Sequence, residues 1–387
     1  MKNIVLILLL TTTSILYGVD DTPIDWNALD FSNSPIQSTE FERLLNELYA
    51  PYGEWHDLIQ IQEDGFTVAR SSETPSDKIF IPFSKQSLST PPNKTSLRGL
   101  RIAIDPGHIG GTWGPLEERS FSLNNGPTVQ EGDLTLAVAK RIKDILEAKG
   151  AIVYLTRVNS NPVTPLRPKD FEQEAQSRIP QTKERFGDAL TQARQKLTTR
   201  LFIRSAEIKE RARLLNQNFN PDFAIALHIN ANGWEDPENP TAVTDNNAHI
   251  LVNGGYMTSE IKNDEMRYMM LHRISKGYHT TEIPLAQAVT QEMIKATALP
   301  PYIYQGKNAI RVDTEGYIWG RNLLANRIFD CPVIFLEPWT ANSTTVYPWA
   351  AQGDYQGFRK IGDTKKKSLP SEYTTFVING LLQYFEN

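Results

Sequence analysis

The sequence predicts an α/β protein in which a mostly parallel, twisted sheet is flanked by helices on both faces and joined to a small N-terminal α+β module. From residue 100 onward, short apolar, often β-branched runs alternate with amphipathic stretches of helical period, which is the pattern of βαβ units. Three of the apolar runs end in a polar side chain, at His108, His228 and Glu337. Ligand sites of open α/β sheets lie at the carboxyl ends of strands, so we expect these three side chains to meet there.

The composition is that of a globular protein. Of the 387 residues, 40% are hydrophobic and 22% are charged, which is enough for a sizeable core and for two or three domains. The net charge of −5 argues against nucleic acid as the main partner.

The first residues have the features of a signal peptide, which we assign to residues 1–18. Lys2 supplies the positive charge, residues 4–10 are apolar, and small or polar residues lead to a cleavage site near Gly18. The apolar run is too short for a comfortable membrane span, although an uncleaved N-terminal anchor is the alternative. We therefore expect an exported protein of the periplasm or cell envelope, without a stable membrane span in the mature chain.

Residues 19–95 form the expected N-terminal module and its linker. Residues 35–49 combine Ser/Thr capping chemistry with apolar side chains at helical spacing. Three short strand-like runs follow, at residues 58–62, 66–70 and 78–83. The stretch 84–98 is rich in Ser, Pro, Thr and Asn, and it reads as a linker.

Residues 96–387 form the expected main domain, which opens with a βαβ unit. Residues 133–149 are amphipathic and are followed by Gly150, a natural helix end. With strands at 100–104 and 151–157, this helix makes a right-handed crossover between parallel strands. Further helices are expected at 204–218, 264–277, 281–299 and 373–385, and a further strand at 249–253.

Two segments of this domain look like insertions. The first, around residues 158–200, is polar, mixed in charge and partly helical, and the second, around 233–247, is dense in Pro, Asp, Glu and Asn. The only cysteine, Cys331, lies inside an apolar run, so it cannot form an intramolecular disulfide and is expected to be a buried, unreactive thiol.

The candidate site has the composition of a zinc centre. Catalytic zinc takes three protein ligands from His, Glu, Asp or Cys and keeps one position for water. His108 and His228 are candidate ligands, and Glu131 precedes the crossover helix at the same sheet edge. Glu337 suits a general base better than a fourth ligand, because a fourth protein ligand would close the site.

Other interpretations of these residues stay open at this point. Glu117 or Glu118 precedes Glu131 in a loop and is an alternative ligand, and Glu337 could instead cap a helix or join a buried ion pair. Arg157 is expected to pair with a carboxylate or to cap a strand end, and His272 and His279 are expected to be solvated. His249 is expected to be structural, with a position in the cleft as the alternative. Three further residues could bind substrate or could be solvated or ion-paired, namely Arg321, Asn322 and Arg327.

Five motifs follow one another along the chain: IDPGH ending at His108, EGDLTLA beginning at Glu131, VYLTR ending at Arg157, LHINA containing His228, and VIFLE ending at Glu337. In this order they resemble the motifs of the zinc-dependent N-acetylmuramoyl-L-alanine amidases, of the type that separates daughter cells. The resemblance covers about residues 100–385, interrupted by the two insertions.

The resemblance implies that His108, Glu131 and His228 bind Zn²⁺ and that Glu337 is the catalytic carboxylate. It also implies the reaction, hydrolysis of the amide between N-acetylmuramic acid and L-alanine in peptidoglycan, with a glycan strand and a free stem peptide as products. Bound zinc lowers the pKa of its water toward about 7 and polarises a carbonyl. A protein activator is a further expected partner, and the N-terminal module would position the enzyme in the envelope or on a partner.

The chain departs from the family pattern at three places. The family commonly has Gly directly after the first histidine, where this chain has Ile109, and Lys after the ligand glutamate, where this chain has Gly132. After Glu337 the family's Gly-Phe is replaced by Pro338 and Trp339. These changes concern the rim of the site, so we expect them to affect substrate preference.

Two other functions stay open, a non-catalytic peptidoglycan-binding or regulatory protein and a zinc peptidase that cuts stem peptides. The insertion at 158–200 also has two interpretations, a peripheral helical hairpin and a lid that covers the metal until a partner removes it.

Overall fold

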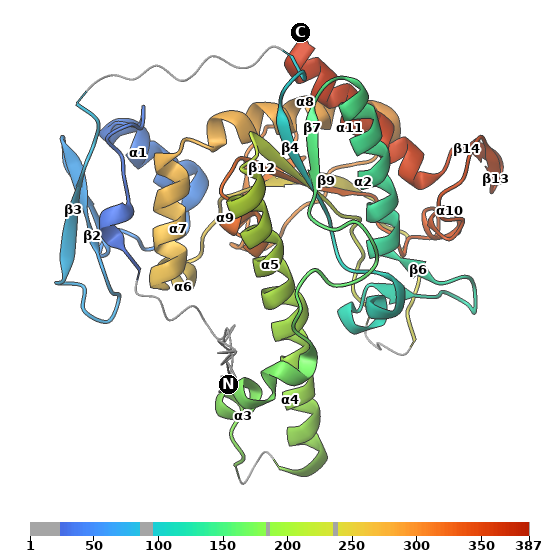
Figure 1. The fold of residues 1–387 in the computed structure, drawn as a ribbon, viewed down its shortest axis with the longest axis horizontal. Helices are drawn as coiled ribbons and strands as arrows, with labels where there is room; N and C mark the ends of the chain where they lie inside the picture. Colours follow the sequence, from blue (N-terminus) through green and yellow to red (C-terminus); the bar gives the residue numbers. More distant parts are fainter. Residues whose placement is uncertain (1–23, 86–95, 183–185, 235–238, 387) are drawn as a thin grey trace, which may run out of the picture.

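The computed structural model describes residues 24–85, 96–182, 186–234 and 239–386 (Figure 1). The signal peptide expected at residues 1–18 lies outside the described residues, as do residues 86–95 of the linker and short parts of both insertions.

A seven-stranded sheet of order β10-β11-β9-β12-β8-β4-β7 forms the centre of the molecule. The neighbours β7 and β4, β4 and β8, β8 and β12, and β9 and β11 run parallel, whereas β9 and β12, and β10 and β11, run antiparallel. The predicted mostly parallel sheet is therefore confirmed. The strands are β4 (Arg101–Pro106), β7 (Ile152–Leu155), β8 (Phe223–Leu227), β9 (Ala248–Val252), β10 (Ile310–Arg311), β11 (Ile318–Gly320) and β12 (Val333–Pro338).

Helices cover both faces of this sheet, as predicted, and alternation along the strands explains how (Figure 1). Ile102 and Ile104 of β4 belong to the core shared with α2 (Glu131–Ala148), α8 (His279–Thr297) and α11 (Leu369–Glu386). Ala103, between them, faces the opposite core, with α5 (Glu207–Leu214) and α9 (Leu324–Ile328). The amphipathic helix predicted at 133–149 starts two residues earlier, and Gly150 follows its last turn at φ +89°.

The N-terminal residues form the expected small α+β unit. Its strands β1 (Ile59–Ile61), β2 (Gly65–Ala69) and β3 (Lys78–Pro82) pair antiparallel beside α1 (Ser38–Leu44), which continues as a π-helical turn, η2 (Leu45–Tyr49). This unit packs on α6 (Thr258–Ile261) and α7 (Asp264–Ser275). Arg267 of α7 donates to the carbonyl of Ala69 at 2.8 Å, and its side chain is buried.

The segment around 158–200, which was expected to be an insertion, contains η4 (Pro168–Phe171), α3 (Glu172–Arg178) and most of α4 (Gly187–Leu201). A π-helical turn, η5 (Phe202–Ala206), joins α4 to α5, so that a long helix runs out from the sheet with α3 beside its far end (Figure 1). We call residues 168–206 the arm. Its form is that of the hairpin interpretation, and the lid stays a prediction.

The remaining elements are short, and most were not predicted from sequence. These elements are η1 (Trp26–Ala28), η3 (Gly111–Glu117), β5 (Ser120–Phe121), β6 (Val129–Gln130), η6 (Leu215–Phe219), α10 (Tyr347–Ala350), β13 (Arg359–Ile361) and β14 (Thr364–Lys366).

No helix in the described part of the chain has the length and apolar character that a membrane span requires.

Candidate metal centre

The first histidine is presented by a tight turn after β4. His108 has φ +60°, in the left-handed region that only a well-supported non-glycine residue adopts. Gly107 lies so close to the His228 imidazole that a Cβ at this position would be 2.3 Å from its Cε1. The absence of a side chain at residue 107 therefore lets the ends of β4 and β8 approach until the two imidazoles stand 5.0 Å apart, edge to face.

Two buried arginines hold this turn through its carbonyl groups. Arg211 of α5 donates to the carbonyls of Pro106 and His108, both at 2.9 Å, and pairs with Asp105 at 3.0 Å. Arg157 donates to the carbonyl of Gly132 at 2.7 Å, so it joins the strand end to the start of α2. Of the two roles expected for Arg157, capping is the one observed. The turn is thus held by hydrogen bonds that do not use the imidazole.

Glu131 is the first residue of α2, and its buried carboxylate points to both histidines. Its Oε1 lies 3.1 Å from His228 Nδ1 and accepts from the amide of Ile229 at 3.0 Å. Its Oε2 lies 3.3 Å from His108 Nε2. One ligand atom from each of His108, Glu131 and His228 falls within 4.8 Å of the other two.

Glu117 and Glu118, the alternative ligands, lie elsewhere. Glu117 is buried, accepts from the amide of Ile109 at 2.6 Å and places Oε1 3.4 Å from His108 Nδ1. It therefore orients the imidazole from the far side and leaves Nε2 directed at Glu131. The side chain of Glu118 is exposed and lines a neighbouring cavity.

These residues fit a divalent metal. Two imidazole nitrogens and one carboxylate oxygen are donors that Zn²⁺ prefers, and three protein donors leave a position open. A carboxylate hydrogen-bonded to the outer ring nitrogen, as Glu117 is placed to do for His108, is the usual support of a metal-binding histidine. His228 is supported by its ring, which stacks on Phe335 at 4.1 Å.

Glu337 lies beside the three clustered residues. It follows Leu336, the β12 partner of Leu227 in β8, and it is paired in register with His249 of β9. It is a strand residue, not a helix cap, and within the described ranges no hydrogen bond or ion pair engages its carboxylate.

The two carboxylates of the site have opposite pKa shifts. Burial acts to raise the pKa of Glu131, but the charges of His108, His228 and Arg119 outweigh it and lower that pKa to about 2. Burial and the nearby charge of Glu131 raise the pKa of Glu337 to about 7, although His228 opposes the shift. Glu131 is therefore a permanent anion, while Glu337 has a proton affinity suited to exchange near neutral pH.

Aromatic and cationic side chains border Glu337 on the β9 side. The hydroxyl of Tyr304 lies 3.0 Å from Nε2 of the buried His249 and accepts from Arg321 at 3.2 Å. The predicted structural role of His249 matches this contact, and Arg321 carries a positive charge toward Glu337. Asn322 instead accepts from the buried Arg327 at 2.6 Å.

Two other histidines lie away from the site. His272 pairs with Asp330 at 2.8 Å and is only partly exposed. His279 was expected to be solvated, and this expectation is wrong, because its side chain is buried beside Tyr49 of the N-terminal unit. The sequence around it is polar, but the N-terminal unit covers it.

Sequence reasoning missed three residues near the metal site. Glu117 was considered only as a ligand, and Arg211 only as part of the helix expected at 204–218. Arg119, whose Nε lies 3.6 Å from Glu131 Oε2, was not considered. The sequence rarely shows whether an arginine is buried. One signal was present, because Glu207 and Arg211 have the spacing of a helical ion pair, and they do pair at 2.8 Å.

Comparison with known proteins gives one family match. A family model described as N-acetylmuramoyl-L-alanine amidase matches residues 102–337, more than half of the chain. Comparison with curated proteins gives no match.

Several solved structures are similar to the chain at low identity. The amidase Ami1 from Mycobacterium smegmatis is 14% identical, with 75% of this chain and 98% of that chain covered and a TM-score of 0.41. The CwlD amidase from Clostridioides difficile, solved in complex with the GerS lipoprotein, is 12% identical, with 74% and 98% covered and a TM-score of 0.40. The amidase AmiC2 of Nostoc punctiforme is 14% identical, with 74% and 98% covered and a TM-score of 0.40.

Proposed function

The chain belongs to the N-acetylmuramoyl-L-alanine amidase family, and we propose that it uses Zn²⁺ to hydrolyse the amide between N-acetylmuramic acid and L-alanine in peptidoglycan. The observation that carries this proposal is the convergence of His108, Glu131 and His228 within 4.8 Å, with Glu337 beside them. Strands and a helix that are distant in the sequence supply these four side chains to one edge of the sheet.

In the proposed mechanism His108 Nε2, Glu131 and His228 Nδ1 hold the metal. Zinc bound there would polarise the scissile carbonyl and acidify water. Glu337 takes the proton of the attacking water and passes it to the departing amine of L-alanine. Its raised pKa, about 7, suits both transfers, because the group can accept and release a proton at neutral pH. The positive charge of Arg119 lies next to Glu131 and favours the negative charge that develops on the carbonyl oxygen.

We further propose that the enzyme works outside the cytoplasm, in the periplasm or cell envelope, where peptidoglycan is found. Residues 1–18 serve as its signal peptide in this proposal, and the N-terminal unit positions it in the envelope or on a partner. Separation of daughter cells is the proposed process, and a protein activator is the proposed partner.

The first experiment pairs zinc content with peptidoglycan digestion, for the mature chain and for Glu337→Gln. Glu337→Gln keeps the shape of the side chain and removes its ability to take a proton. We expect both proteins to bind one zinc, and only the parent to release stem peptides that begin with a free L-alanine amine. A loss of activity by about 10²–10⁴-fold is typical for removal of a general base.

The other outcomes separate the alternatives. If both proteins bind zinc and neither releases peptide, the chain is a wall-binding or regulatory protein. If the products are shortened stem peptides still joined to muramic acid, it is a peptidase. Undiminished activity of Glu337→Gln would contradict the role given to Glu337.

A further inference from the structure

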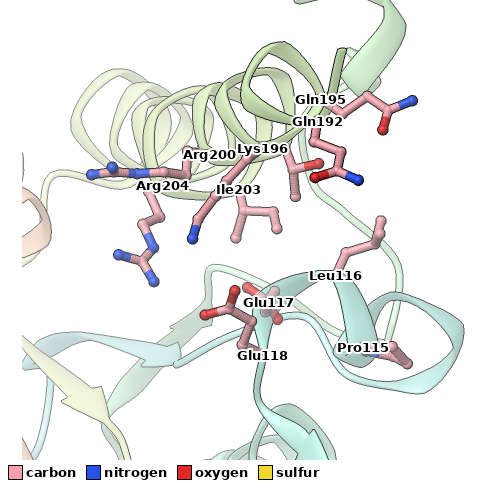
Figure 2. Close-up of a pocket in the computed structure, with 11 residues that line it drawn as sticks. Pro115, Leu116, Glu117, Glu118, Gln192, Gln195, Lys196, Arg200, Ile203 and Arg204 are labelled. Carbon is pink, nitrogen blue, oxygen red and sulfur yellow. The ribbon is translucent and has the colours of Figure 1, made fainter. Parts of the chain in front are cut away.

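A cavity of about 610 Å³ lies beside the metal centre, between the end of η3 and the arm (Figure 2). Glu117 and Glu118 line it from the η3 side, and the helix formed by α4 and η5 lines it from the other. Glu117 is also the residue whose carboxylate lies 3.4 Å from His108 Nδ1. The cavity and the metal centre are therefore separated by a single side chain.

The arm presents a row of positive charges to this cavity. Lys196, Arg200 and Arg204 follow one another at four-residue spacing, so they share one face of the helix. All three side chains are exposed, and none of them makes a hydrogen bond or an ion pair with any residue that the structure describes. Figure 2 shows Lys196 and Arg204 pointing across the cavity toward the turn that carries Glu117 and Glu118.

The opposite wall does not neutralise this row. The carboxylate of Glu117 is already engaged by the amide of Ile109 and lies against His108, which leaves Glu118 as the one exposed anion among the described lining residues. Three cations against one exposed anion give the cavity a net positive potential, which favours an anionic ligand.

We propose that this cavity binds the peptide half of the substrate through its carboxylates. The inference rests on the proposed amidase function, because it concerns which half of that substrate lies here. The glycan half is neutral, since its N-acetyl groups carry no charge and its lactyl carboxyl is consumed in the scissile amide. The stem peptide keeps free carboxylates, so it is the half that matches a row of lysine and arginine side chains.

The dimensions of the row agree with a short peptide. Lys196 and Arg204 are eight residues apart, which corresponds to about 12 Å along a helix. An extended peptide advances about 3.3–3.6 Å per residue, so the row matches three or four residues. Ile203, which is largely buried, gives the cavity an apolar wall between the charges.

The row is also attached firmly to the metal centre. Ile203 and Phe202 of the arm pack with Ile109, the residue that follows His108. The helix that carries the charged side chains is consequently anchored to the turn that presents the first histidine. This attachment explains how a peptide bound by the arm would keep its scissile end in register with the metal.

The test compares two substrates with two variants of the mature chain. One substrate is a disaccharide bearing a stem peptide with free carboxylates, and the other is the same molecule with those carboxylates amidated. The variant is Lys196→Gln with Arg204→Gln. The matched control is Lys262→Gln with Lys276→Gln, which removes the same charge from exposed positions that flank α7 and do not line the cavity. Circular dichroism and thermal unfolding check that both variants fold.

We expect the parent and the control to prefer the free carboxylates by about tenfold in kcat/KM, through KM, and this preference to fall with salt. The Lys196→Gln/Arg204→Gln variant should lose the preference and cleave the amidated substrate as the parent does. Turnover without any preference in the parent, or an equal loss in the control, would overturn the inference and leave the amidase function standing.

A binding measurement separates the two proposals. Titration calorimetry uses the free peptide L-Ala-D-Glu-L-Lys and its amidated form as probes of the parent and both variants. One outcome is that the parent binds the free peptide, the Lys196→Gln/Arg204→Gln variant does not, and the parent releases no peptide from any substrate. This outcome would support the peptide site and overturn the amidase function. Absence of binding together with absence of preference would overturn the peptide site.

Discussion

Glu117 is placed to support the proposed metal centre without being one of its ligands. It lies against the outer nitrogen of His108 and also accepts from the amide of Ile109. These two contacts orient the imidazole, and with Nε2 bound to the metal, as proposed, they would favour the tautomer whose proton is on Nδ1, the nitrogen that faces Glu117.

Glu117→Gln should therefore weaken zinc binding by about 10–100-fold, since the amide is a poorer acceptor for the imidazole N–H. Competition with a chromogenic chelator measures the zinc affinity directly. Glu118→Gln, one residue further along the same turn, is the control and should bind zinc as the parent does. Equal affinities of the Glu117→Gln variant and the parent would show that His108 needs no such support.

At the scale of residues, the sequence discloses side chains that stand at the ends of recognisable strands. His108, His228 and Glu337 are of this kind, and Glu131 opens a helix with a clear apolar period. Arg157 and Arg211 could not be placed in the same way, because their partners are carbonyl groups of a turn far away in the chain. Backbone acceptors have no sequence signature, so hydrogen bonds to them follow only from the fold.

At the scale of elements, the arm shares an apolar cluster with the turn that presents His108. Ile109 is fully buried and packs with Phe171, Phe202 and Ile203. Two of these contacts come from η5, the π-helical turn where the arm joins α5. The two ends of the arm, at Phe171 and at Phe202 and Ile203, therefore meet in an apolar cluster that also supports the His108 turn.

Phe202→Ala should lower the free energy of unfolding by about 3–5 kcal/mol, because the fully buried ring would leave a cavity beneath Ile109. Urea unfolding followed by circular dichroism measures the change. Phe186→Ala is the matched control on the same arm, since that side chain is 62% exposed and its removal should cost little. Similar losses of unfolding free energy in both variants would show that the packing of Phe202 against Ile109 does not stabilise the His108 turn.

Across the whole molecule, burial of histidines couples folding to pH. Burial lowers the pKa of His279 to about 4, whereas an unfolded histidine titrates near 6.5. Between these values the unfolded chain binds a proton that the folded chain does not bind. The free energy of unfolding consequently falls as the pH drops from about 6.5 toward 4, by up to about 1.4 kcal/mol per pH unit for this group.

His279→Phe removes this contribution while keeping a ring beside Tyr49. Between pH 7.5 and 5 the parent should lose about 2 kcal/mol more stability than the variant, as measured by urea unfolding at each pH. The exposed His56, replaced by Phe, serves as the control and should follow the parent. A parallel loss in His279→Phe and the parent would assign the acid sensitivity to other groups.

The fold as a whole was predictable where the pattern is local and repeated. Alternating helices and strands gave the α/β class, and the crossover from β4 through α2 to β7 follows from handedness alone. The antiparallel pairing of β9 with β12 was not predicted, because a buried strand reads the same in either direction. The prediction that His279 is solvated was wrong for a related reason. The burial of His279 depends on contact with Tyr49, some 230 positions earlier in the chain.

The close approach of Gly132 to the His108 turn limits which segments of this protein can be exchanged with those of related proteins. A Cβ at residue 132 would lie 2.5 Å from the amide nitrogen of Gly110, so the lysine usual in the family has no room here. Ile109, in turn, needs the apolar cluster of the arm. The arm, Ile109 and Gly132 must therefore be exchanged together. A chimera that receives the arm alone would lack the matching residues at positions 109 and 132, beside the first histidine.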